Sequence, residues 1–129
     1  MLSKNPRAID PGTYTVILEP AAVADLLLYL AFQFDARSAD EGRSFFAKKG
    51  GGTKIGEKVV SDKVTIWTDP ADARAPEPIF NEEGLPTGRR TWIDDGVLKN
   101  LVYSRFWAQK MDAEPVPSPV NILMNGGSG

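Results

Sequence analysis

The 129-residue sequence contains no cysteine and no histidine. Without cysteine, disulfide bonds cannot stabilise the fold, and the chain suits a reducing compartment, so we expect a cytoplasmic protein. Without histidine, a Ser–His–Asp triad is excluded, and the usual nitrogen and sulfur ligands of zinc are missing. We therefore expect neither a bound metal nor a cofactor.

Long apolar runs and a surplus of basic residues are also missing. No apolar stretch approaches the roughly 20 residues that span a bilayer, and no signal peptide is visible, so we expect no membrane contact. The 15 basic and 17 acidic residues give a net charge of −2, which argues against a nucleic-acid-binding domain. The fractions of hydrophobic (42%) and charged (25%) residues are those of an ordinary globular domain.

The first third of the chain predicts a strand followed by an apolar helix. Side chains alternate from Thr13 to Glu19 in the pattern of a strand. Pro20 suits the first turn of a helix, and apolar residues from Ala21 to Phe34 lie on nearly every side of that helix. Such a helix should be deeply buried or covered by a partner.

Shorter elements are predicted in the middle of the chain. Ser38 and Glu41 form a candidate capping box, which would begin a short helix extending to Ala47. Three glycines at 50–52 would end this helix and open a loop. Alternating apolar and threonine side chains at 64–68 then predict a second strand.

A β-hairpin is predicted in the last third of the chain. The segments Thr91–Ile93 and Val97–Tyr103 are rich in the aromatic and β-branched residues that strands prefer. Between them, Asp94–Asp95–Gly96 supplies the turn. Upstream, Gly84 and Pro86 predict a loop.

The remaining elements complete an α+β fold. Ser104 is predicted to cap a short helix from Arg105 to Lys110, and a proline-rich arm leads to a last strand, Asn121–Met124. We expect a mostly antiparallel sheet with one buried helix and one or two short helices, forming a single domain over residues 1–129.

Several patterns suggest chemistry but are better explained by solvation or turns. The pairs Glu82–Glu83 and Asp94–Asp95 lie in turns, where adjacent carboxylates point in different directions and seldom share a proton or metal. The glycine-rich segment Lys49–Lys54 lacks the residue order of a phosphate-binding loop. Basic residues between Arg43 and Lys63 are interrupted by acidic residues, which indicates a solvated face.

The order E-G-L-P-T-x-R-R-T-x-I-x-x-G-V-L-K-N-L, held by Glu83 to Leu101, resembles the C-terminal domain of the TldD/PmbA family. The resemblance extends upstream to Pro11–Leu18 and downstream to Asn121–Gly127, and therefore covers nearly the whole chain. Members of this family are metallopeptidase-related proteins that are also described as modulators of DNA gyrase. Because members carry a separate N-terminal domain and continue past the glycine-rich end, we expect this chain to be a fragment of a larger C-terminal domain.

The catalytic branch of this family carries His-Glu-x-x-x-His on the helix after its first strand. Two histidines can bind one zinc, and the glutamate can polarise the bound water. In this chain the resemblance places that hexapeptide on residues 28–33, where Leu28, Tyr29 and Gln33 stand in place of the three functional residues. The zinc site is therefore lost, and Tyr29 or Gln33 is left to line a remaining cavity or to pack in the core.

The resemblance implies a non-catalytic, PmbA-like role in peptide or protein processing. Such a chain would pair with a homologous TldD-type catalytic subunit or with itself, and would contact a peptide substrate. Exposed strand edges beside the hairpin are the expected place for a peptide, by β-augmentation. The candidate contacts for a peptide or partner are Arg89, Arg90, Trp92 and Tyr103.

Two alternatives to the partner role remain open. The chain is an active metallopeptidase if its metal ligands lie outside this segment. It is a stand-alone protein-interaction domain, a gyrase modulator, if it acts without a peptidase. The substrate and the identity of the partner are not encoded in any recognisable motif.

Overall fold

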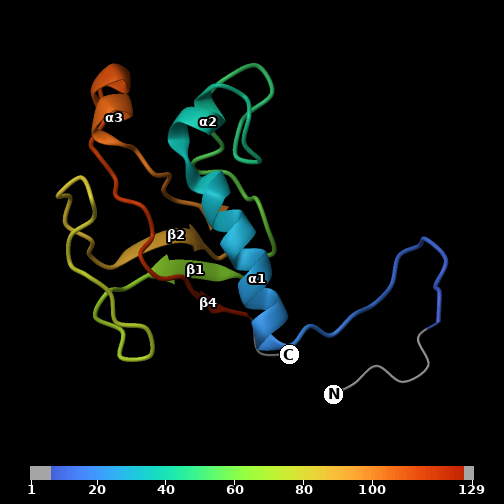
Figure 1. Cartoon of the computed structure of the whole chain (residues 1–129). Helices are drawn as coiled ribbons and strands as arrows, with labels where there is room; N and C mark the ends of the chain where they lie inside the picture. Colours follow the sequence, from blue (N-terminus) through green and yellow to red (C-terminus); the bar gives the residue numbers. More distant parts are fainter. Residues whose placement is uncertain (1–6, 127–129) are drawn as a thin grey trace.

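A small antiparallel sheet lies at the centre of the structure, a computed structural model that describes residues 7–126. Its four strands follow the order β3-β2-β1-β4, and Figure 1 labels three of them, β2, β1 and β4. The α+β fold predicted from the sequence is confirmed. The elements are α1 (Pro20–Ala31), the 3-10 turn η1 (Phe32–Phe34), α2 (Ala36–Asp40), β1 (Thr65–Thr68), β2 (Arg90–Asp94), β3 (Val97–Leu98), α3 (Arg105–Met111) and β4 (Leu123–Asn125).

The hairpin forms where the sequence predicts it, although its second strand is short. Asp95 and Gly96 both have positive φ, +45° and +79°, as a two-residue type I′ turn requires. The strand predicted to run to Tyr103 ends at Leu98. The N–H groups of Lys99 and Asn100 both donate to the carbonyl of Trp92, so two residues oppose one and the regular ladder stops.

The core packs around aromatic side chains brought together from distant segments. Phe34 stacks on Phe46 with ring centroids 5.2 Å apart, and Trp92 lies at the same distance on another side of Phe34. All three are fully buried. The other large, fully buried side chains come from the sheet and from the segment after β3: Ile66, Ile93, Leu98 and Leu101. The aromatic residue that ends η1 therefore anchors the first third of the chain to the sheet.

The apolar helix is present, but the chain itself does not bury it, so only the other half of the prediction, cover by a partner, stays a prediction. α1 begins at Pro20 as expected, ends at Ala31, and contains no buried residue. Leu27 and Leu30 are partly buried against the core, whereas Leu28 and Tyr29 keep 62% and 74% of their surface exposed. The core therefore covers only the side of α1 that carries Leu27 and Leu30.

The strand predicted at Thr13–Glu19 is wrong for this chain. These residues pair with no strand among residues 7–126, and Ile17 is 98% exposed. Figure 1 shows this segment as a blue arm that leads away from the body of the structure and enters α1. A strand needs a neighbour to satisfy its N–H and C=O groups, and the described chain supplies none.

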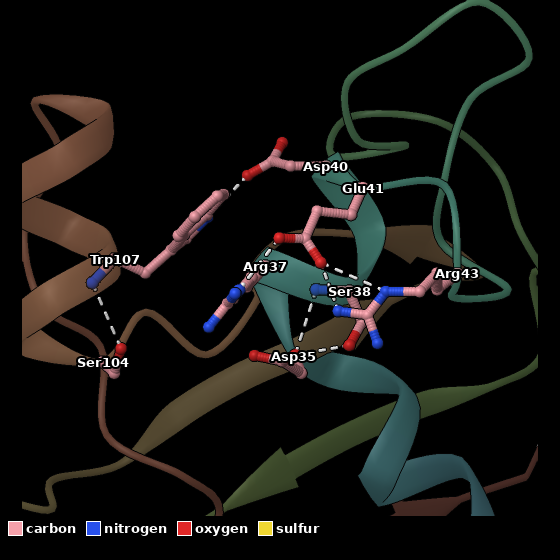
Figure 2. A network of polar contacts seen from close by, with 8 residues as sticks. All are labelled: Asp35, Arg37, Ser38, Asp40, Glu41, Arg43, Ser104 and Trp107. Atoms are coloured by element: carbon pink, nitrogen blue, oxygen red, sulfur yellow. Dashed lines mark hydrogen bonds and ion pairs between the residues drawn. The ribbon is translucent and has the colours of Figure 1, made fainter.

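The N-terminal caps of the short helices show one incorrect and one correct prediction. α2 is capped by Asp35, whose Oδ2 accepts from the Ser38 N–H at 3.0 Å, so Ser38 is not the cap (Figure 2). Glu41 pairs with Arg37 and Arg43 instead of closing a capping box, and no helix extends to Ala47. Ser104 does cap α3, because its Oγ accepts from the Trp107 N–H at 3.2 Å.

The last strand, β4, begins two residues later than predicted, at Leu123. It pairs antiparallel with β1, with Thr65 opposite Asn125. Asn121, the first residue of the predicted strand, is buried and binds the loop after β1 with its side chain.

Among the helices of residues 7–126, none combines the length and the hydrophobicity that a membrane span requires.

Candidate functional site

A groove of about 820 Å³ opens where the end of α1 meets two loops. Its volume lies within the range of about 300–1,000 Å³ that is typical of ligand pockets. Four segments line it: the junction of α1 with η1 and Asp35, the loop at 77–83, the segment after β3 at 102–104, and the proline-rich arm at 116–120. The lining residues are Ala31, Phe32, Asp35, Glu77, Pro78, Phe80, Asn81, Glu82, Glu83, Val102, Ser104, Val116, Pro117, Ser118, Pro119 and Val120.

Backbone bridges hold these segments together. The Ala36 N–H donates to Val102 O at 3.0 Å, and the Val102 N–H donates to Phe34 O at 2.7 Å. Tyr103 and Val116 exchange two backbone hydrogen bonds, of 3.0 and 2.9 Å. The segment after β3 therefore runs between η1 and the arm and joins the walls of the groove.

Side chains within the 77–87 loop fix its shape. Asn81 Oδ1 accepts from the N–H groups of Glu83 at 3.1 Å and Leu85 at 2.8 Å, as in an Asx turn. The Thr87 hydroxyl donates to Pro78 O. These bonds present Phe80 and the neighbouring carboxylates at the rim.

The charge of the groove is of one sign. Four carboxylates line it, from Asp35, Glu77, Glu82 and Glu83, and no lysine or arginine is among the lining residues. Two of the four carboxylates already accept hydrogen bonds from the chain. Asp35 caps α2, and Glu83 Oε2 accepts weakly from the Arg105 N–H at 3.4 Å. Arg105 also donates through Nε to Glu83 O at 3.1 Å, which places one cation at the edge.

The residues that the resemblance aligns with the zinc motif do not line the groove. Leu28 and Tyr29 lie on the exposed part of α1. Gln33 is held in structural bonds, since its Oε1 accepts from the Phe45 N–H at 3.0 Å and its carbonyl accepts from the Ser44 hydroxyl at 2.8 Å. Neither Tyr29 nor Gln33 lines this cavity; Ala31 and Phe32 of the same hexapeptide do.

The described part of the chain contains no group of candidate metal ligands. Within residues 7–126, no three or more His, Cys, Asp or Glu residues are arranged to hold a metal ion. The four groove carboxylates therefore do not form such a group, although they share one cavity.

The four predicted peptide contacts are not brought together at this groove. Trp92 is fully buried and presents no surface to a partner, so it cannot serve as a contact in this structure. Arg90 is half-buried in β2 opposite Thr68, and Arg89 is exposed beside it. Tyr103 is half-buried, and burial together with the Asp40 carboxylate raises the pKa of its phenol.

Few features of the sequence indicate that these residues line a groove. Tyr103 lies between two lining residues, Val102 and Ser104, so the prediction missed the groove by one position there. Alternating prolines at 115, 117 and 119 indicated an extended arm but not what it faces. The loop residue Phe80 had no recognisable pattern at all.

The network beside the groove stabilises the walls and is not a catalytic arrangement. The Trp107 indole N–H donates to Asp40 Oδ2 at 2.8 Å and joins α3 to α2 (Figure 2). The cationic groups of Arg37 and Lys110 lie 5.4 and 4.9 Å from the centre of the Trp107 ring. The Asp40 and Arg37 contacts join α2 to α3, whereas the Lys110 contact lies within α3.

Comparison with known proteins identifies relatives of much greater length. The chain is 27% identical over 113 residues to a protein named "Metalloprotease" from Archaeoglobus fulgidus, covering 86% of this chain and 26% of that protein. A protein of the same name from Methanothermobacter thermautotrophicus is 36% identical over 62 residues, which are 48% of this chain and 14% of that protein. The chain thus spans about a quarter or less of these curated relatives.

Solved structures share the fold. A structure from Bacteroides thetaiotaomicron, described as a candidate modulator of DNA gyrase, is 26% identical with a TM-score of 0.69 and covers 84% of this chain and 24% of that chain. TldE from Thermococcus kodakarensis is 22% identical with a TM-score of 0.61, covering 77% of this chain and 24% of that chain, which shows the fold alone. The model of the PmbA/TldA metallopeptidase C-terminal domain matches residues 11–127, and the chain therefore belongs to this metallopeptidase-related family.

Proposed function

We propose that this chain is a non-catalytic segment of a TldD/PmbA-like peptidase assembly, in which it contributes a peptide-contacting wall and a metal-bearing relative contributes the zinc chemistry. One observation carries the proposal: at the positions that the resemblance assigns to the family motif stand Leu28, Tyr29 and Gln33, with no zinc ligand among them, and a groove lies beside the same hexapeptide. Peptide binding needs an apolar, shaped surface, and it needs no metal.

The surroundings of the hexapeptide support this assignment. Gln33 bonds the backbone of the following loop, and Leu28 and Tyr29 are exposed apolar side chains suited to an interface. A zinc ligand needs a nitrogen, sulfur or carboxylate donor aimed at the metal. None of the three side chains offers such a donor.

Metal content and hydrolysis test the proposal. The complete natural protein that contains this 129-residue chain should carry no stoichiometric zinc by elemental analysis and should not cleave an unfolded protein on its own. About one zinc per chain that resists mild chelation, together with hydrolysis that strong chelation abolishes, would establish the alternative of an active metallopeptidase.

A second candidate is a protein-interaction domain that acts on DNA gyrase. The observation that favours it is the likeness to structures described as candidate gyrase modulators, at 26% and 25% identity. This candidate predicts binding of the chain to a gyrase subunit and a changed rate of DNA supercoiling. An unchanged supercoiling rate at a saturating concentration of the chain would exclude this candidate.

A further inference from the structure

We propose that the groove between α1 and the proline-rich arm binds an extended peptide in which apolar residues are flanked by lysine or arginine. The inference rests on the proposed peptide-contacting role and adds a substrate class to it. Its basis is the combination, in one cavity, of exposed apolar side chains and uncompensated carboxylates.

The apolar part of the groove is exposed to solvent. Phe32 and Phe80, which line the groove from different segments, retain 74% and 57% of their surface. Val102 and Val116 also line it and are half-buried, and Pro117 is buried in the wall. Removing such apolar area from water is favourable, so these side chains provide a driving force for an occupant with apolar side chains of its own.

The charge of the groove selects the sign of the occupant. Glu77 and Glu82 are exposed lining residues whose carboxylates make no hydrogen bond or ion pair within residues 7–126. Asp35 and Glu83 add negative charge but already bond neighbouring groups. Arg105 is the cation at the edge, and it bonds the Glu83 carbonyl without entering the lining. A basic side chain gains from this field, whereas an acidic peptide or a nucleic acid is repelled.

The walls favour recognition of side chains over addition of a strand. Pro117 and Pro119 have no N–H to donate, and Val116 already exchanges backbone bonds with Tyr103. The arm therefore offers few free backbone donors to a β-augmenting peptide, which differs from the edge beside the hairpin expected from the sequence. The exposed Ser118 is a polar side chain at the rim that can bond a peptide backbone.

The test measures fluorescence anisotropy of labelled peptides with the full chain. The probes are three capped hexapeptides that alternate leucine with lysine, glutamine or glutamate. The lysine peptide should bind about tenfold or more tightly than the glutamate peptide, with the glutamine peptide between them, and added salt should reduce the difference. Equal affinity for all three, or no saturable binding of any, would overturn the inference.

Variants locate the binding site. The double variant Glu77→Gln/Glu82→Gln should lose about three- to tenfold in affinity for the lysine peptide and little for the glutamine peptide. The matched control, Asp25→Asn/Glu114→Gln, removes two exposed carboxylates outside the groove and should change neither affinity. An equal loss in the control would show that only net charge matters and would overturn the assigned site.

The apolar contribution has its own pair of variants. Phe80→Ala should weaken the lysine and glutamine peptides alike, whereas Phe106→Ala, at a 65% exposed position on α3, should not. No effect of Phe80→Ala would overturn the apolar part of the assignment. These readouts are independent of zinc and hydrolysis. A chain that binds zinc and is active would contradict the proposed function. A zinc-free chain that binds the three peptides without charge selectivity would contradict only this inference.

Discussion

Asp35 serves both the fold and the groove. Its backbone is extended, with φ −64° and ψ 114°, and it separates η1 from α2. Its carboxylate accepts from both the N–H and the hydroxyl of Ser38, at 3.0 and 2.6 Å, while the residue also lines the groove. A substitution of Asp35 would therefore disturb a helix cap and a groove wall together.

Gly96 is the residue of the hairpin turn that least tolerates a side chain. Its φ is +79°, and an added Cβ would lie 2.5 Å from Val60 O and 2.6 Å from Ser61 O. Gly96→Ala should lower the free energy of unfolding by about 2–5 kcal/mol, because backbone strain and overpacking add. Chemical denaturation measures this loss.

Gly84→Ala is the matched control for that variant. Gly84 also has positive φ, +68°, but no atom lies within 4 Å of the added Cβ. This variant should cost only the conformational strain, about 1–2 kcal/mol. Equal losses in the two variants would contradict the close approach of the 60–61 backbone to the turn.

Tyr103 should make stability depend on alkaline pH. Burial, and then the Asp40 carboxylate, raise the pKa of its phenol above 10.0. The folded chain therefore holds this proton more tightly than the unfolded chain. The resulting stabilisation is fully present below the unfolded pKa and is lost as pH rises through the folded pKa.

The melting temperature of wild type should accordingly fall more steeply than that of Tyr103→Phe between about pH 9 and about pH 11. The comparison cancels the titration of lysines, which both proteins share. Parallel curves for the two proteins would show that the phenol is solvated in the folded state.

At the scale of elements, Asn121 joins the last strand to the loop after β1. Its Oδ1 accepts from the Thr68 hydroxyl at 2.8 Å and the Asp69 N–H at 2.9 Å. Its Nδ2 donates to the carbonyls of Asp69 and Ala75, at 2.7 and 2.6 Å. The residue is only 8% exposed, so water cannot replace all of these bonds.

Asn121→Ala should therefore lower the free energy of unfolding by about 2–4 kcal/mol, since it leaves buried donors and acceptors unpaired. Asn125→Ala, at an exposed position that ends β4, is the control and should have little effect. Thermal and urea unfolding measure both variants. A small effect at Asn121 would mean that the loop at 69–75 rearranges without cost.

Elements specified by local chemistry were predictable from the sequence, and elements that depend on distant segments were not. The Asp95–Gly96 turn, the Ser104 cap and the start of α1 at Pro20 each depend on a few adjacent residues. Ser38 and Glu41 match the local pattern of a capping box, which predicts a cap at Ser38. In the structure Asp35 caps α2 instead, and Asp35 also forms a β-bridge with the distant Val102.

The same reason explains the errors in strands and in the site. The segment at 13–19 has the alternation of a strand but finds no neighbour among the described residues. The groove is made by the junction at Phe32, the loop at 77–83 and the arm at 116–120, which are far apart in sequence. Periodicity and motif spacing do not report such contacts, because only tertiary packing creates them.

At the scale of the whole molecule, apolar side chains are exposed to solvent along α1 and along residues 13–18 before it. The large side chains of this surface are Tyr14, Val16, Ile17, Leu18, Leu26, Leu28, Tyr29 and Phe32. Together they expose apolar area on the order of the ~800 Å² that each partner buries in a standard interface. The segment Thr13–Leu18 is also uncharged, β-prone and without a paired edge in the described chain, so it can recruit another strand.

The chain alone should self-associate through this surface at micromolar concentration, most simply as a two-fold dimer. Leu28→Glu places a charge in the surface and should shift the equilibrium toward monomer by about tenfold or more. Phe106→Glu, at an exposed position on α3, is the control and should not. Light scattering over a concentration series measures the dissociation constant, and a concentration-independent wild-type monomer would contradict the expectation.

The central claim is that the chain assembles with a metal-bearing relative as a non-catalytic partner. Sedimentation velocity of a mixture of the two proteins tests it most directly. The full chain is combined with a His-Glu-x-x-x-His-bearing family member from the same organism, with absorbance labels that distinguish the two. We predict a common, faster-sedimenting species that Leu28→Glu weakens and Phe106→Glu does not. Independent sedimentation of the two proteins at every concentration and ratio would contradict the account.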